Sequence, residues 1–166
     1  MTLEDLKSLQ RRNWSIGSHG SPDLTTLTEE QLKAEFEDIT QYLKSNGLSG
    51  YNHYAYPMGR YNSLVTSVAD RYFKTARTIH VQPETTIPAE RRKLRVFDVI
   101  NTTTNSQLLD ALTRANRNGI TLILVFHRIV STTSEPEDVS IANFTTFMQT
   151  VASSGIPVTN IEMAYR

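Results

Sequence analysis

Apolar residues recur at every third or fourth position in five stretches of the chain, which is the spacing of one face of an α-helix. The clearest helix begins after Thr28, which has capping-box spacing with Gln31, and ends at Asn46-Gly47, where glycine permits a left-handed residue. Its apolar face consists of Leu32, Phe36, Ile39 and Leu43. The other four helices are expected near residues 2–9, 64–72, 106–117 and 140–153.

Short apolar stretches between these helices are expected to form strands. Their approximate ranges are 14–16, 54–56, 73–78, 94–100, 120–126 and 156–161. Residues 120–126 are almost continuously apolar and rich in branched side chains, which is typical of a strand buried on both faces. Because strands and helices alternate, the pattern predicts an α/β fold with a mainly parallel sheet.

The length of the chain predicts one domain that spans residues 1–166. Residues 80–93 hold Pro83 and Pro88 but few large apolar side chains, which indicates an excursion over the surface. Residues 131–138 are polar and are expected to form a loop.

Composition excludes several classes of function. The formal net charge is +0, so neither nucleic acid nor an anionic membrane is an expected partner. The absence of Cys excludes disulfides, thiolate metal sites and cysteine nucleophiles, and it fits a reducing compartment. No signal peptide and no apolar run of membrane-spanning length are recognisable, so a cytoplasmic location is the default expectation.

Candidate chemistry is expected at the strand ends, because ligands of parallel α/β folds bind at the carboxyl ends of the strands. His19 follows the first predicted strand, the Tyr56-Pro57 turn follows the second, and His127 ends the apolar run at 120–126. An imidazole at such a position can serve as an acid or a base. The alternative for His127 is a histidine that only hydrogen-bonds a loop carbonyl.

Three segments, in this order along the chain, resemble the polysaccharide deacetylase family, the nodulation-deacetylase-like carbohydrate esterases. They are Ile16-Gly17-Ser18-His19, Tyr56-Pro57-Met58-Gly59-Arg60-Tyr61-Asn62 and Leu122-Ile123-Leu124-Val125-Phe126-His127. The resemblance implies an incomplete or distorted (β/α) barrel. It also implies hydrolysis of N-acetyl groups on polysaccharides or oligosaccharides with a divalent metal, zinc or similar.

The resemblance also assigns roles to single residues. His127 matches the histidine that protonates the departing amine, and His19 matches one of two metal-binding histidines. The second of these is absent ahead of Pro22-Asp23-Leu24-Thr25, so Asp23 is either a replacement ligand or a turn residue. One wall of the substrate groove is implied for four residues, Tyr56, Pro57, Gly59 and Tyr61, whose rings suit a pyranose and whose backbone suits a tight turn.

The family's opening strand, which ends in an Asp-Asp pair, has no counterpart here. Glu4-Asp5 and Glu37-Asp38 lie in predicted helices, so about one strand-helix-strand unit is missing relative to the family. The sheet is expected to be open at that edge and the chain to form a homo-oligomer there. Three functions stay open: a deacetylase domain completed by another chain, an inactive glycan-binding module, and a structural or assembly domain.

Overall fold

The chain, described as a computed structural model over residues 1–20, 23–81 and 90–165, forms two compact units. Unit 1 comprises Met1–Thr78, Glu90–Leu94 and Thr159–Arg166. Unit 2 comprises Ile79–Ala89 and Arg95–Val158. Most of the predicted surface excursion, including Pro83 and Pro88, lies outside the described residues.

Three parallel strands follow one another, β1 (Gly17–Ser18), β2 (Gly50–Ala55) and β3 (Thr75–Val81), and all but the end of β3 from Ile79 belongs to unit 1. Gly17 pairs with Gly50, and a Cβ atom on Gly50 would lie 2.6 Å from the carbonyl carbon and oxygen of Ile16. Glycine therefore permits the close approach of β1 and β2. The first strand begins later than expected, because pairing starts at Gly17 and leaves residues 14–16 outside it.

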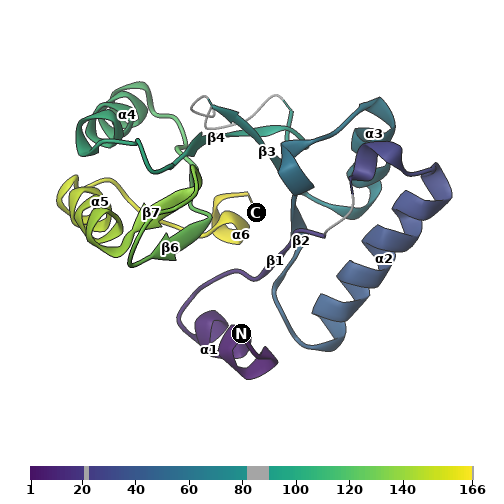
Figure 1. The fold of residues 1–166 in the computed structure, drawn as a ribbon. Coiled ribbons are helices and arrows are strands. Elements are labelled where there is room, and N and C mark those ends of the chain that lie inside the picture. The colour runs from purple at the N-terminus through teal and green to yellow at the C-terminus, as the bar shows by residue number, and fades with distance from the viewer. Residues whose placement is uncertain (21–22, 82–89, 166) are drawn as a thin grey trace. The chain divides into compact units, whose positions relative to one another are not determined.

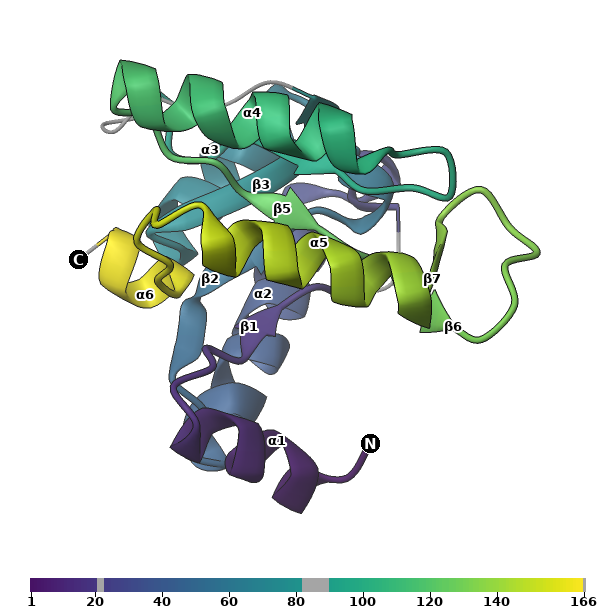
Figure 2. The same cartoon turned by 90° about the vertical axis from the view of Figure 1, so that its left-hand side faces the viewer.

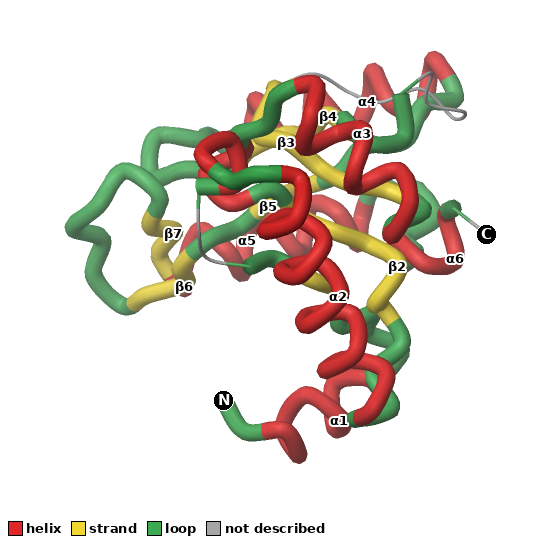
Figure 3. The backbone as a smooth tube through the Cα atoms, turned by 90° about the vertical axis from the view of Figure 1, so that its right-hand side faces the viewer, coloured by secondary structure: helices red, strands yellow, loops and turns green. Residues whose placement is uncertain are grey.

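The helices of unit 1 are α1 (Leu3–Arg11), α2 (Glu29–Ser45), α3 (Ser63–Tyr72) and α6 (Ile161–Ala164), with short 3-10 turns η1 (Leu24–Thr26) and η2 (Pro57–Gly59). The expected capping box at Thr28 is present, and a second capping box forms at Thr2. Figures 1 and 3 show α2 and α3 side by side, and α2 contacts β1 and β2. The helices predicted near 2–9, at 28–45 and at 64–72 are confirmed.

Aromatic rings fill the core of unit 1. The Phe36 ring centroid lies 5.1 Å from that of Tyr54 and 5.1 Å from that of Phe73, both edge to face. Such pairs contribute about 0.5–1.5 kcal/mol beyond the burial of their area. The same cluster contains Leu24, Leu32, Tyr56, Val65, Val68, Ala69 and Ala76. The face predicted for α2 is therefore the face that packs on the strands.

Apart from Leu94, unit 2 contains two parallel strand pairs, β4 (Leu94–Asp98) with β5 (Leu124–Val125) and β6 (Arg128–Val130) with β7 (Asp138–Ser140). Helices α4 (Asn105–Asn118) and α5 (Ile141–Ser153) run side by side, as Figure 2 shows. The buried cluster beneath them consists of Val99, Leu108, Leu112, Val139 and Phe147. Parallel pairing in both units confirms the predicted α/β class.

Two expectations for the second half of the chain are wrong, and a third differs only at its last residue. The run at 120–126 forms a strand only at Leu124–Val125. Val125 is its one buried residue, and Leu122, Leu124 and Phe126, which pack against the cluster, are only partly buried. Residues 156–161 form no strand, since the Asn160 side chain accepts the N–H of Met163 and starts α6. The expected loop at 131–138 ends in β7, which pairs with β6.

No helix within the described ranges is long and apolar enough to cross a membrane.

Candidate functional site

His19 directly follows β1 and is held by the neighbouring strand. Its Nδ1 lies 2.8 Å from the carbonyl oxygen of Ala55, the last residue of β2. A carbonyl oxygen can only accept, so Nδ1 carries the hydrogen and Nε2 keeps its lone pair. This orientation by a backbone carbonyl is typical of a metal-binding histidine. His19 therefore presents one suitable metal ligand at the exposed end of the strand.

Asp23 uses both carboxylate oxygens locally. Oδ1 accepts the N–H and the hydroxyl of Thr25 at 3.1 and 2.7 Å, which caps η1, and Oδ2 accepts from the Arg60 guanidinium at 2.7 Å. The Thr25 hydroxyl, followed by Arg60, lowers the pKa of Asp23 below its ordinary value. These contacts are those of a turn residue, the second of the two alternatives set out for Asp23.

A complete metal centre does not fit the residues at hand. The described part of the chain contains no group of three His, Cys, Asp or Glu side chains that could hold a metal ion. A catalytic zinc normally takes three protein ligands, and His19 supplies only one. Asp23 is already paired with Arg60. A divalent metal, implied by the family resemblance, would need ligands beyond these residues.

The segment Tyr56 to Tyr61 forms a sharp turn at the end of β2. Met58 has φ 53° and Gly59 has φ 65°, so two successive residues are left-handed, as suits a tight turn. A methionine in this region is uncommon and costs free energy. The Met58 side chain is 53% exposed at the tip of the turn.

The predicted wall residues differ in exposure. Tyr56 and Pro57 are buried, and the Tyr56 ring packs 5.6 Å from the ring of Tyr61, which is only partly buried. Burial raises the pKa of Tyr56. The Lys93 ammonium lies 5.7 Å from the centre of the Tyr61 ring. Tyr56 and Pro57 therefore lie beneath the predicted wall, and Tyr61 is the tyrosine that can offer a ring face to a sugar.

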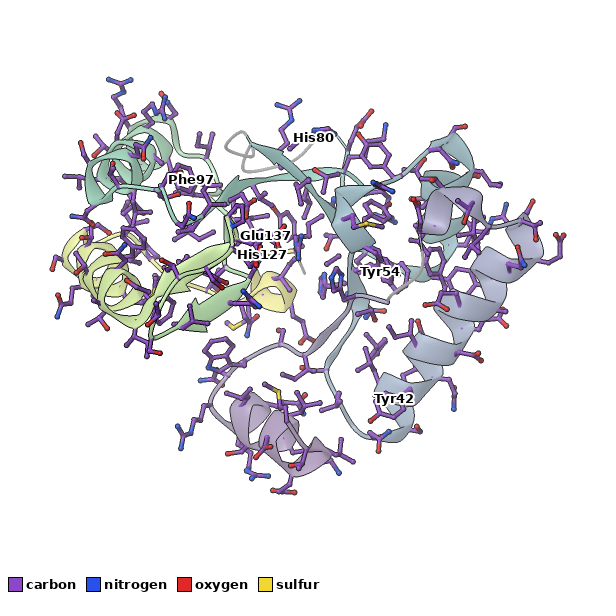
Figure 4. The ribbon with its side chains drawn as sticks, in the orientation of Figure 1. Tyr42, Tyr54, His80, Phe97, His127 and Glu137 are labelled. Carbon is purple, nitrogen blue, oxygen red and sulfur yellow. The ribbon has the colours of Figure 1, made fainter. Side chains whose placement is uncertain are left out.

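His127 belongs to unit 2, where it pairs with a carboxylate. Its Nε2 lies 3.1 Å from Oδ1 of Asp98, and the two side chains are 28% and 21% exposed. Asp98 is the last residue of β4 and is in register with Val125 of β5, two residues before His127. His127 is labelled in Figure 4. The partner found for His127 is thus a carboxylate and not the loop carbonyl of the alternative interpretation.

Asp98 is the functional candidate that sequence reasoning missed. It lies two residues before the end of the strand predicted at 94–100, so its position near a carboxyl end was a usable signal. Its partner could not be inferred, because the pairing depends on the register between β4 and β5. The candidates of unit 1 come together at the end of β2: His19 on Ala55, and Asp23 on Arg60 of the following turn.

Comparisons with known proteins give one family match and several similar structures. Residues 2–75 match the family model described as polysaccharide deacetylase. The Streptococcus pyogenes deacetylase PplD, solved with acetate, is similar at 23% identity and TM-score 0.61, covering 67% of this chain and 50% of that chain. A family 4 carbohydrate esterase from Streptomyces lividans, solved with acetate, is similar at 19% identity and TM-score 0.55, covering 92% and 68%. No curated protein matches the sequence.

These likenesses bear on the fold. The chain spans half the length of the Streptococcus pyogenes protein. The coverage of 92% in the second comparison confirms the distorted (β/α) barrel class that the sequence predicted.

Proposed function

We propose that this chain, whose predicted resemblance to the polysaccharide deacetylase family is confirmed by the match over residues 2–75, binds N-acetylated polysaccharide and holds part of a deacetylation site. The observation that carries this proposal is the Asp98–His127 pair at the ends of two parallel strands. His19, oriented by Ala55, and the Tyr61 ring support it from unit 1.

The paired imidazole suits one step of amide hydrolysis. When the C–N bond of an N-acetyl group breaks, the departing nitrogen must gain a proton. Asp98 holds Nε2 of His127, which leaves Nδ1 as the nitrogen that can give this proton. The neighbouring carboxylate fixes the orientation of the ring and so determines which of its nitrogens is left for this step. His127 is therefore proposed as the general acid and Asp98 as the residue that orients it.

The earlier step, attack by water, lacks its groups in this chain. No adjacent Asp pair occurs in the sequence, and the described residues do not form a complete metal site. Binding of the glycan and late protonation are the contributions that remain. We therefore propose that the chain by itself binds the glycan but releases acetate at a negligible rate, and that a carboxylate-bearing partner is needed for turnover.

The test measures binding and turnover separately. An acetylated chito-oligosaccharide is titrated into the protein by NMR, and acetate release is followed in parallel. We expect shifts of Tyr61 and its neighbours without acetate release, and we expect binding to survive His127→Ala. Absence of binding would overturn the proposal. Acetate release at ordinary enzyme rates, lost in His127→Ala, would overturn the proposal that the chain by itself is inactive.

Zinc binding tests the incomplete metal site. Calorimetric titration is expected to show weak binding or none, since His19 alone is oriented as a ligand. Any weak binding should vanish in His19→Ala. A stoichiometric site of submicromolar affinity that survives this substitution would place the metal site elsewhere in the chain.

Self-association is a second candidate function, favoured by the surface around α1. No residue of α1 is fully buried, and Trp14 just beyond it is 60% exposed. β1 is only two residues long and pairs with β2 alone among the described strands. A second copy could cover this edge across a two-fold axis.

Light scattering across a dilution series tests self-association. Trp14→Ser should shift the protein toward monomer. Tyr42→Ser on α2 removes an aromatic side chain of similar exposure, 55%, and should leave the mass unchanged. A folded wild-type monomer at every concentration would refute the second candidate.

A further inference from the structure

We propose that Asp138, Arg128 and Asn101 are positioning residues that hold the Asp98–His127 pair together. Their role in catalysis rests on the function proposed above, but their effect on the pair itself does not. All five residues belong to unit 2. The inference follows from two ties that meet at the same turn, residues 134–136.

The first tie centres on the buried carboxylate of Asp138. The residue is 0% exposed. Oδ1 accepts from Nε and Nη2 of Arg128 at 2.7 Å each, a two-point contact. Oδ2 accepts the backbone N–H groups of Ser134 and Glu135 at 2.8 and 2.9 Å. Charge-assisted bonds of this kind are stronger than neutral ones and fix geometry as well as distance.

The ionised state of Asp138 is secured by its partners. The N–H of Ser134, then that of Glu135, and after these Arg128 lower the pKa of Asp138 to about 2. The carboxylate is therefore charged at neutral pH. Breaking the contact would leave a charge buried without a partner, which proteins rarely tolerate.

The contact between Asp138 and Arg128 anchors the residue that directly follows His127. Arg128 is the next residue in the chain and begins β6, where it is in register with Asp138 of β7. The guanidinium contact therefore locks the first pair of the β6–β7 ladder immediately after the imidazole. Figure 3 shows the loop that joins β6 and β7, within which the turn 134–136 lies.

The second tie links the same turn to the segment after Asp98. The backbone N–H of Asn101 donates to the carbonyl of Pro136 at 2.9 Å, and its Nδ2 donates to the carbonyl of Glu135 at 3.2 Å. Glu135 thus gives its N–H to Asp138 and its carbonyl to Asn101. Between the two ties, Val99 donates to the carbonyl of Val125 at 2.9 Å.

The arrangement anchors the chain segments that follow both partners of the pair. The chain after Asp98 and the chain after His127 are each anchored to residues 134–136, although the two partners are 29 residues apart in sequence. The pair itself is a single contact of 3.1 Å between partly exposed side chains. A single exposed contact persists only where the surrounding backbone holds its ends, because catalytic geometry tolerates little displacement.

The test reads the state of His127 and not only stability. The ratio of its Nε2–H to Nδ1–H tautomers is measured by ¹⁵N NMR of the imidazole at neutral pH. Asp98→Ala defines the ratio for a lost pair. We expect Asp138→Asn and Asn101→Ala each to move the ratio several-fold toward that of Asp98→Ala, with the larger shift in Asp138→Asn.

Two controls keep the outcome decisive. Asp110→Asn removes a carboxylate from an exposed ion pair with Arg114 in the same unit and should leave the ratio unchanged. Asn101 is exposed, so Asn101→Ala decides the matter if Asp138→Asn does not fold. An unchanged ratio in folded Asn101→Ala would overturn the positioning role. A shifted ratio without glycan binding would uphold it while refuting the proposed function.

Discussion

The two units of this chain hold their candidate side chains by different means. Unit 1 surrounds its strands with a buried cluster rich in aromatic rings, and His19 is fixed by one carbonyl of that rigid frame. Unit 2 has a smaller cluster, in which Phe147 is the buried aromatic residue and other phenylalanines are only partly buried, and its strands have two to five residues. Its pair of Asp98 and His127 is held by a network of charged hydrogen bonds around Asp138.

The difference teaches which conditions the candidate side chains of each unit should tolerate. Apolar burial responds to the loss of volume and little to pH. A buried carboxylate that accepts four hydrogen bonds responds to protonation and to removal of any single donor. Substitutions that create cavities should therefore separate the units most strongly, and changes of pH should separate them in distinct ranges.

The largest expected effect is that of a cavity in unit 1. Phe36→Ala removes the ring on which Tyr54 and Phe73 pack and should lower the free energy of unfolding of unit 1 by about 3–5 kcal/mol. Amide hydrogen exchange followed by NMR measures this loss residue by residue. We expect unit 1 amides to lose protection and unit 2 amides to keep it, because Phe36 belongs to a separate cluster.

Phe147→Ala provides the matched change in unit 2. It removes the same side chain from the other cluster, where Phe147 is 2% exposed. The pattern of lost protection should reverse. Equal losses in both units after either substitution would show that the chain unfolds as one cooperative body and that the two clusters do not act separately.

Acidification should weaken unit 1 before unit 2. Burial, and to a smaller extent Lys74, lowers the pKa of His53 below its ordinary 6.5, although Glu162 opposes the shift. The unfolded chain then binds the proton more readily, so this stability is complete above pH 6.5 and is lost as pH falls below it. For Asp138 the pKa falls from 3.8 to about 2, so its contribution is lost only between these values.

Urea unfolding, followed by NMR signals of each unit at several pH values, measures both contributions. His53→Gln keeps a neutral partner for the Thr75 hydroxyl, 2.8 Å from Nδ1 of His53, and should flatten the slope of unit 1 below pH 6.5. Asp138→Asn should flatten the slope of unit 2 below pH 3.8. Identical slopes for wild type and His53→Gln would mean that the pKa of His53 is the same in the folded and the unfolded chain.

Local signals explain how much of the fold was predictable. The capping boxes at Thr2 and Thr28 and the left-handed glycine after Asn118 involve neighbours within a few residues, and the helices they bound are confirmed. The strands of unit 2 depend on partners distant in sequence. The apolar run at 120–126 therefore looked like a long strand, although only Leu124–Val125 finds a partner of the right register.

The site was predictable in its positions and not in its contacts. His19 and His127 follow strands, as expected from the rule that ligands meet strand ends. The Asp98 partner of His127 and the Arg60 partner of Asp23 arise from register and turn geometry. The burial of Tyr56 likewise depends on how α2, α3 and β2 enclose the ring, which composition alone does not reveal.

The smallest expected effect concerns two tyrosine hydroxyls of unit 1. The Tyr56 hydroxyl is buried without a hydrogen-bond partner among the described residues, whereas the Tyr72 hydroxyl donates to Glu37 at 2.7 Å. A buried hydroxyl without a hydrogen bond has lost its bonds to water, and no bond within the protein compensates for that loss. Tyr56→Phe should therefore stabilise unit 1 by about 1 kcal/mol, and Tyr72→Phe should destabilise it by about 1 kcal/mol. Both changes remove one oxygen and keep the ring, so the opposite signs isolate the hydrogen bond.

Urea unfolding of the two variants gives the comparison. A loss of stability in Tyr56→Phe equal to that in Tyr72→Phe would show that the buried hydroxyl has a hydrogen-bond partner, such as a bound water.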